Sequence, residues 1–490
     1  MAAPSQSGFG TSTLGRGRLG AGSLTFFTVS ASAPMTVLAG GVTTAFAVTG
    51  NVGVPLAFPV LTIVLALFAV GYAAMSRYVV NAGVFYAYIS RGLGGMWGTS
   101  ASFVALVAYN TIQIGLYGLF GAVAADFFHA HGGLTWSWWV YALISMAIVG
   151  ILGLLNVDLN AKVLAVLLIA EIIAVLLFDI AGLANPTGTG GVFTGLAPHN
   201  LFAAGVGGVF AFAIACFIGF ESAGDYAEEA KDPRRTVGRS LFITVAITGI
   251  LYTLSAWAMS VGLGPHEVVG QSQQNGPGVV FIEIDAHFGS TVADIANVLL
   301  MTSVFAAMLS FHNTVARYLF AGGRERVLPR MMSVTSTRTK APVVGSITQT
   351  VLALILVLIF VMKKQDPVAA LFTWLSFIAA VGVLLLMFGT SIANMVFLNR
   401  YRDTESAWQR TVAPLLAAIS LAAILYVTAT NASSVLGTEK GSSLVWILPG
   451  IVVAAAVLGL AWGAIMRATN QPVYASIGKG GPEEELLGST

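Results

Sequence analysis

Charged residues are scarce in this sequence: only 9% of its 490 residues are Asp, Glu, Lys or Arg, whereas 57% are hydrophobic. Soluble domains carry about 25% charged residues, so the composition excludes an ordinary soluble fold. The net charge of +2 gives no reason to expect nucleic acid as a partner. Because Cys216 is the single cysteine, an intrachain disulfide and a cysteine-cluster metal site are excluded. The composition predicts an all-α polytopic membrane protein whose main surroundings are the lipid bilayer.

Enzyme motifs are also missing. The sequence has no P-loop, no HExxH and no GxSxG, and no nucleophile–base or metal constellation, so we expect no enzyme and no cofactor. The polar, Gly- and Ser-rich segment 1–23 reads as a tail and not as a cleavable signal peptide. In segment 264–289, Glu283, Asp285 and His287 alternate, and alternate residues share a face only on a strand. We therefore expect a solvated loop there and not a metal site.

Twelve apolar stretches reach the roughly 20 residues that a membrane span needs. They are 24–48, 54–74, 97–125, 138–156, 161–183, 203–226, 237–262, 290–319, 343–362, 367–398, 412–430 and 444–466. The 55 glycines suit helices that pack closely in lipid. Segment 76–95 is too polar to span and too apolar for a plain loop, so we expect it to lie along the membrane surface.

Basic residues predict the orientation. If the N-terminus is cytoplasmic, only Lys363, Lys364 and Lys440 of the 23 Lys and Arg residues lie outside. Cytoplasmic segments carry the excess of Lys and Arg in membrane proteins. Both tails, 1–23 and 467–490, are therefore expected in the cytoplasm, with the protein in the cell (inner) membrane of a bacterium.

The first span carries proline and small residues at mid-membrane depth, in Ser30, Ser32 and Pro34. Proline cannot donate a backbone hydrogen bond, so the helix is expected to unwind near Ala31–Met35; a simple proline kink is the alternative. Freed backbone at that depth is tolerated only beside protein, water or a ligand.

The sixth span has small residues at the corresponding place, Ala213–Cys216, followed by Gly219. Paired interruptions in the two halves of a transporter indicate a substrate site near the middle of the membrane. The N-terminal end of a half-helix attracts a carboxylate, and the C-terminal end attracts a cation. Together they suit a zwitterion such as an amino acid.

Several polar side chains lie within the spans. Asn110, Gln113 and Tyr117 share one helix face and are expected either to line the site or to bond neighbouring helices. Glu171 needs a proton, a cation or a basic partner, and no Lys or Arg lies in a span core, so we favour ion or proton coupling. For His312 we favour a structural role over a proton relay.

Two acidic residues and the cysteine need separate interpretations. Glu221 either holds the broken sixth span against its neighbours or lines the inner path. Asp179, nearer the outer surface than Glu171, is expected to be hydrated. Cys216 is most simply a small packing residue.

The segment FIGFESAGDYAEEAKDPRRTVGRS resembles the sixth-span signature of the amino acid–polyamine–organocation (APC) superfamily. NAGVFYAYISRGLGG and NTVARYLFAGGRERVLP are further matches in the right order. The resemblance implies a LeuT-type fold with five-plus-five inverted repeats (spans one to five and six to ten, 24–398), followed by two additional helices (399–466).

The resemblance also implies roles for individual residues. Ser32, Ala33, Pro34 and Met35 would bind the substrate carboxylate, and the backbone near Ala213, Ala215, Cys216 and Ile218 would take the amine. Asn110 and Gln113 would flank the substrate side chain, which Phe311 would cover. The usual Gly-Ser-Gly of the first span is replaced here by Ser32–Met35. Ala215 stands where the antiporters have an aromatic gate, and Glu171 stands where many members carry a lysine.

These observations predict a secondary transporter that takes up an amino acid by alternating access, coupled to a proton or to sodium, with the proton favoured. Glu171, Glu221 and His312 are the candidate coupling groups. A polyamine or monoamine carrier, or an amino acid exchanger, is the alternative. A channel or a sensor is disfavoured because the sequence shows no repeated pore filter and no soluble sensor domain.

Overall fold

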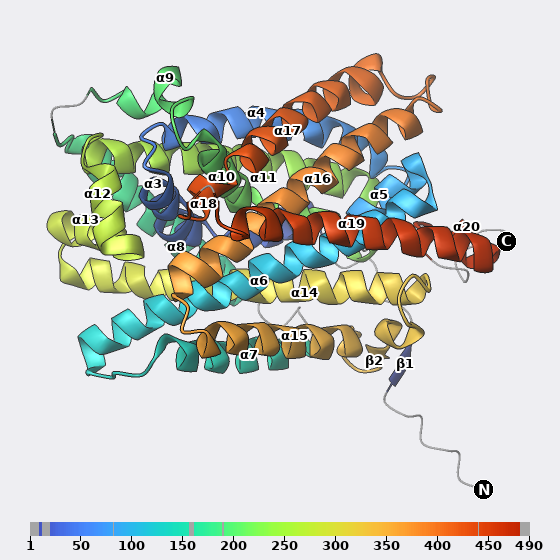
Figure 1. Cartoon of the computed structure of the whole chain (residues 1–490), viewed down its shortest axis with the longest axis horizontal. Helices are drawn as coiled ribbons and strands as arrows, with labels where there is room; N and C mark the ends of the chain where they lie inside the picture. The colour runs from blue at the N-terminus through green and yellow to red at the C-terminus, as the bar shows by residue number, and fades with distance from the viewer. Residues whose placement is uncertain are drawn as a thin grey trace, which may run out of the picture.

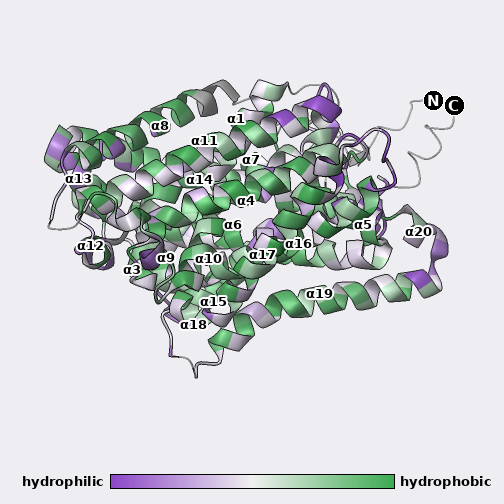
Figure 2. Cartoon of the chain, turned by 90° about the horizontal axis from the view of Figure 1, so that it is seen from above, coloured by the Kyte–Doolittle hydropathy of each residue, from purple (hydrophilic) through white to green (hydrophobic). Residues whose placement is uncertain are grey.

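Long helices run side by side through the whole molecule (Figure 1). The structure is a computed structural model that describes residues 9–11, 20–81, 83–155, 161–188, 191–439 and 441–480. Hydrophilic residues gather at the two ends of this bundle and its middle is hydrophobic (Figure 2), as expected of a polytopic membrane protein. Residues 1–8, 12–19 and 481–490 of the two tails, with Arg16 and Arg18, lie outside the described residues, as does Lys440.

Within the described residues, eleven helical segments are long and apolar enough to cross a membrane, judged by length and composition, and α7 is a shorter apolar helix. In chain order the segments are α1 to α3 (Ala21–Thr49), α4 (Val54–Met75), α6 (Gly95–Gly132), α7 (Trp138–Gly153), α8 (Ala161–Ala184), α10 with η4 (Val206–Ala223), α11 (Pro233–Gly262), α14 (Ser290–Arg324), α15 (Val343–Met362), η8 with α16 (Pro367–Leu398), η9 with α17 (Trp408–Thr430) and α19 (Leu444–Thr469). Each predicted span overlaps one of them.

Shorter elements connect these segments. They are the strands β1 (Phe9–Thr11) and β2 (Thr335–Ser336), which pair antiparallel, and α5 (Val84–Leu93), η3 (Thr194–Leu196), α9 (Pro198–Leu201), η5 (Ala227–Glu229), α12 (Val268–Asn275), η6 (Gly276–Gly278), α13 (Val279–Phe288), η7 (Arg330–Ser333), α18 (Ala432–Val435) and α20 (Gln471–Ser476). Glycine allows close helix packing, as predicted: a Cβ on Gly459 of α19 would lie 2.6 Å from the Cα of Ser100 on α6.

Two local predictions are wrong, and a third, that segment 76–95 lies along the membrane surface, stays a prediction. Nearly all side chains of α5 in that segment are buried against α6 and α16. Segment 264–289 is not a plain loop, because it folds into α12 and α13, where Glu283 and His287 lie one turn apart. No group of three or more potential metal ligands occurs among the described residues. Asp179 is not hydrated: it is 1% exposed and accepts a hydrogen bond from Ser255 on α11.

Candidate functional site

The first span breaks where the sequence predicts. Helix α1 (Ala21–Ser32) ends at Ala33, whose backbone is left-handed with φ of 43°, and α2 (Pro34–Thr36) starts directly afterwards. A left-handed backbone disfavours any residue with a Cβ, so the surrounding structure must hold Ala33 in place. The π-helix η1 (Val37–Val42) and α3 (Thr43–Thr49) complete the span. The C-terminal end of α1 and the N-terminal end of α2 therefore meet inside the bundle.

The sixth span breaks at Ile218 and Gly219, the last part of the predicted interruption. Helix α10 (Val206–Phe217) includes Ala213–Cys216 in its last turns and ends at Phe217. Gly219 has φ of 109°, a conformation that favours glycine, and the 3-10 turn η4 (Phe220–Ala223) follows. The two breaks are neighbours, because a Cβ on Gly219 would lie 3.1 Å from the Cβ of Ala31.

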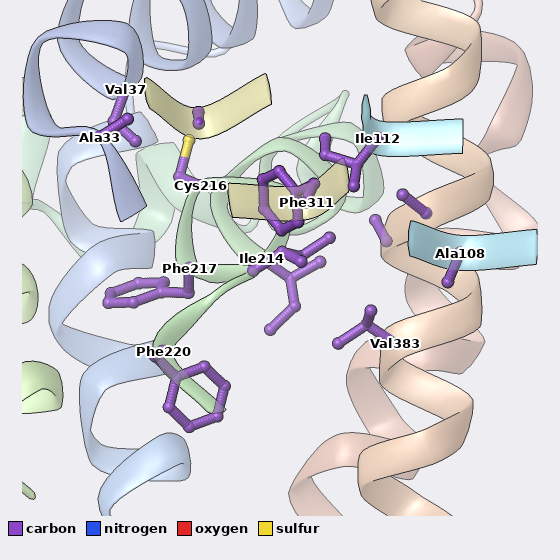
Figure 3. Packing of buried hydrophobic residues seen from close by; sticks show 14 of the residues in the cluster. Ala33, Val37, Ala108, Ile112, Ile214, Cys216, Phe217, Phe220, Phe311 and Val383 are labelled. Atoms are coloured by element: carbon purple, nitrogen blue, oxygen red, sulfur yellow. The ribbon is translucent and has the colours of Figure 1, made fainter. Parts of the chain in front are cut away.

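A cavity of about 40 Å³ lies beside the two breaks. The first and sixth spans form one side, and α6, α14 and the tenth span form the other; its lining residues are Ala31, Ser32, Ala33, Thr36, Val37, Gly41, Ile112, Leu116, Phe212, Ala215, Cys216, Ile218, Ala307, Phe311, Phe372 and Ser376. Figure 3 shows the ring of Phe311 between Cys216 and Ile112. A volume of this size holds a few waters, whereas ligand pockets measure about 300–1,000 Å³. A small-molecule ligand therefore fits only if the helices move apart.

Six of the predicted substrate residues line this cavity and five do not. Those in the lining are Ser32, Ala33, Ala215, Cys216, Ile218 and Phe311. Pro34, Met35, Asn110, Gln113 and Ala213 are buried outside the lining. The amide of Asn110 donates to the Leu106 carbonyl of its own helix, over 2.6 Å. Gln113 turns towards α15, where its side-chain oxygen accepts a hydrogen bond from Gln349.

The lining contributed by α6 is apolar. Ile112 and Leu116 occupy it, one turn apart. Neither was predicted, because only the polar residues of this helix were candidates for the site. Phe212, Phe372 and Ser376 were missed as well. No charged side chain belongs to the lining. Ile112 is two positions from Asn110, a spacing that puts the two side chains on different faces of α6.

Glu171 of α8 lies at the break of the first span. One oxygen of its carboxyl group accepts hydrogen bonds from the Met35 backbone N–H, over 2.6 Å, and from the Ser303 hydroxyl of α14, over 2.5 Å. Ser303 also bonds the Thr36 hydroxyl, over 2.9 Å. The carboxyl group thus occupies the positive N-terminal end of α2, a position that favours an anion. It links the first span to α8 and α14.

Glu221 lies in η4, directly after the break of the sixth span, and bonds to α6. Its carboxylate accepts a 2.5 Å hydrogen bond from the Tyr109 hydroxyl of α6 and a 3.1 Å bond from the Gly219 N–H. The hydroxyl of Tyr72 on α4 donates to the Glu221 carbonyl. The Tyr109 ring also stacks on Phe311, with 6.4 Å between ring centres. This network connects the break of the sixth span to the cavity wall.

His312 lies away from the cavity although it follows Phe311 directly. Its Nε2 is 2.7 Å from the Ser346 hydroxyl of α15, and the side chain is fully buried. The ring packs against Gly153 of α7, where an added Cβ would clash with it. Within the described hydrogen bonds, no contact that could relay a proton joins His312 of α14 to Glu171 of α8.

Interrupted apolar helices beside a cavity inside the bundle are typical of membrane transporters. The sequence matches the family model described as amino acid permease over residues 19–457, and the chain therefore belongs to the amino acid permease family.

The relatives include bacterial, plant and rodent amino acid transporters. The chain is 25% identical to the branched-chain amino acid permease BcaP of Bacillus subtilis over 322 residues, which are 61% of this chain and 66% of the relative. It is 24% identical to BcaP of Lactococcus lactis over 332 residues, 62% of this chain and 68% of the relative. A third similarity, 30% over 161 residues, is to the cationic amino acid transporter 7 of Arabidopsis thaliana; it covers 30% of this chain and only 25% of the relative.

Proposed function

We propose that this protein is a secondary transporter that binds an amino acid at the cavity beside Ala33 and Gly219 and moves it by alternating access. The observation that supports this most is the meeting of two helix breaks at one buried cavity. The C-terminal ends of α1 and α10 suit the ammonium group, and the N-terminal end of α2 suits the carboxylate. The proposal includes the LeuT-type repeat, twelve spans and a cell-membrane location with both termini inside.

The apolar lining favours a small neutral substrate. Val37, Ile112, Leu116 and Phe311 supply hydrocarbon surface, and burial of a methylene group stabilises binding by about 0.8 kcal/mol. Both BcaP permeases are named for branched-chain amino acids, which have compact apolar side chains. We therefore propose valine, leucine, isoleucine or a similar neutral amino acid as the substrate.

A carrier of cationic amino acids or of amines is the second candidate, and the similarity to plant cationic amino acid transporters favours it. A cationic side chain buried in a transport site needs an anionic partner. Glu171 and Glu221 are the acidic residues next to the breaks, yet neither belongs to the cavity lining. The neutral substrate therefore remains the better supported one.

We assign coupling to Glu171 because its carboxyl group joins the break of the first span to α14. When it is ionised, it competes with a substrate carboxylate for the N-terminal end of α2. Protonation removes that competing charge, so proton entry and substrate binding favour one another. The same carboxylate would attract sodium if the coupling ion were a metal cation.

Uptake into proteoliposomes tests the substrate and the ion together. Labelled leucine is offered against a panel of unlabelled amino acids and diamines, with an imposed pH gradient, a sodium gradient or neither. We expect competition from valine and isoleucine, none from arginine or putrescine, and stimulation by an inward proton gradient. Competition by arginine or diamines alone would move the function to the cationic alternative.

The Glu171→Gln variant tests the coupling role. Glutamine keeps an acceptor oxygen for Met35 and Ser303 but cannot ionise, so we expect uptake that no longer responds to the pH gradient. Asp179→Asn is the matched control, since it removes another buried carboxyl group from α8. The control should keep its pH response, and an unchanged pH response in Glu171→Gln would exclude Glu171 as the coupling group.

A further inference from the structure

A second and much larger cavity lies at the surface, away from the helix breaks. It measures about 790 Å³ and is formed by the C-terminal end of α4 and the N-terminal end of α11. Its lining includes Arg77, Arg234, Arg235 and Arg239, together with the aromatic side chains Tyr78 and Phe242. We call this cavity the arginine groove. Its volume is within the range of small-molecule sites in proteins.

The charge of the arginine groove is largely uncompensated. Arg77 forms an ion pair with Glu405, over 3.1 Å, while its side chain stays 42% exposed. In the part of the chain that the structure describes, no ion pair involves the side chains of Arg234, Arg235 or Arg239, and all three are exposed. The N-terminal end of α11 adds the positive pole of a 30-residue helix. The groove therefore attracts an anion.

The groove is apolar on the side that continues into the spans. Phe242 lines it and is 41% exposed, and Ile243, Ile247 and Ile250 follow along α11 with exposures of 40%, 40% and 69%. These side chains face outwards along a membrane-crossing helix, so their surroundings are lipid tails. An occupant of the groove therefore meets a cationic region and a hydrocarbon surface next to each other.

We propose that the arginine groove binds the headgroup of an anionic phospholipid from the adjoining leaflet, which is the cytoplasmic leaflet in the proposed orientation. The guanidinium groups of Arg234, Arg235 and Arg239 bind its phosphate, since arginine donates paired N–H groups in a geometry that matches phosphate oxygens. The acyl chains lie along Phe242 and Ile243. Basic pockets between membrane helices on the cytoplasmic side bind anionic headgroups by this chemistry.

Native mass spectrometry of the full-length protein in neutral detergent tests this site. Dioleoyl phosphatidylglycerol and dioleoyl phosphatidylcholine are titrated against the wild type and the R234Q/R235Q/R239Q variant. We expect the wild type to prefer phosphatidylglycerol and the variant to bind it about a hundredfold more weakly, from the contributions of three surface arginines. The single variant R239Q should weaken binding of phosphatidylglycerol about fivefold. It replaces the triple variant as the test if the triple variant does not fold.

A matched control removes three other exposed arginines from the same end of the bundle: R330Q/R338Q/R467Q. It should bind phosphatidylglycerol as the wild type does, and a loss equal to that of R234Q/R235Q/R239Q would show general charge attraction and overturn the proposal. A second arm adds inorganic phosphate. If phosphate alone binds the groove and displaces phosphatidylglycerol, the site takes a soluble anion and the lipid assignment is wrong.

Discussion

At the scale of single residues, the most unusual conformation in the candidate site belongs to Ala33. A non-glycine residue in a left-handed backbone costs about 1–2 kcal/mol relative to the right-handed form. Ala33 nevertheless lines the cavity with this backbone, between the two halves of the first span. The conformation is thus held by the surrounding fold at the candidate site and not by the intrinsic preference of alanine.

We predict that Ala33→Gly raises the unfolding free energy by up to about 1 kcal/mol, because glycine adopts this backbone without the steric cost. Leucine uptake should survive the change, since no polar contact is lost. Ala33→Val should abolish uptake, because a branched side chain suits neither the backbone nor the cavity. Melting temperatures and uptake rates check both variants, and a destabilised Ala33→Gly would contradict the interpretation.

Residue roles were only partly predictable from the sequence. Pro34 and Glu171 stand out in apolar stretches by their chemistry, and both lie at the first break. Gln113 has a chemistry that suits a substrate site, yet its partner Gln349 lies 236 positions away, and nothing local indicates that pairing. Ile112 and Leu116 were missed for the opposite reason, because apolar residues in an apolar helix carry no distinguishing signal.

At the scale of elements, the two breaks differ in how well the sequence marks them. Proline marked the position of the first break, whereas the sixth span offered both Ala213–Cys216 and Gly219. Alanine is an excellent helix former, so α10 continues through Ala213–Cys216, and the break comes at Gly219. The burial of α5 was not predictable, because it depends on packing against α6 and α16 that no local pattern encodes.

The C-terminal segment that contains α20 is attached to the bundle, since the Ser90 hydroxyl of α5 donates a 2.9 Å hydrogen bond to the Ile477 carbonyl. Val473 and Ile477 form a small apolar cluster with Val327 and Met466. We predict that removing residues 471–490 lowers the unfolding free energy by about 2–4 kcal/mol, the value of burying one or two such side chains. The melting temperature of the truncated protein checks this, and an unchanged value would show that the segment is not held in the membrane-embedded protein.

Glu325, directly after α14, anchors that segment and yields a prediction for pH. It is fully buried and accepts hydrogen bonds from the Gly478 and Gly480 N–H groups, over 2.6 and 2.9 Å, and from Asn81. Burial raises the pKa of Glu325 above its usual 4.5, although these donors favour the carboxylate. The folded protein therefore holds this proton more tightly than the unfolded chain does.

This sign means that the stabilising contribution of Glu325 is complete below pH 4.5 and is lost as the pH rises through the folded pKa. We predict that the melting temperature of the wild type falls relative to that of Glu325→Gln as the pH is raised from acid to neutral, because glutamine does not titrate. If the wild type instead becomes more stable than Glu325→Gln as the pH rises, the hydrogen bonds outweigh burial and the pKa of Glu325 is lowered.

At the scale of the whole molecule, charge is distributed unevenly between the two ends of the bundle. Arg77, after α4, pairs with Glu405 in the connection between α16 and α17, and Arg324 of α14 pairs with Glu228 over 2.7 Å. Each ion pair joins two separate connections, and all four connections are ones that the sequence predicts to be cytoplasmic. The positive-inside rule uses only the sequence, and these contacts add which of the predicted cytoplasmic connections are neighbours in space.

The orientation itself can be measured because the chain has a single, buried cysteine. In a Cys216→Ala background that retains uptake, Gln274→Cys places an exposed thiol on α12, and Asp403→Cys places one between α16 and α17. Three candidate spans, α14, α15 and η8 with α16, lie between these positions, so the two thiols face opposite sides of the membrane if all three segments cross it. We predict that a membrane-impermeant maleimide labels Gln274→Cys in intact cells and labels Asp403→Cys only after permeabilisation. The reverse pattern would invert the molecule and place the arginine groove in the outer leaflet, whereas labelling of both positions in intact cells would show that the segments between them do not cross an odd number of times.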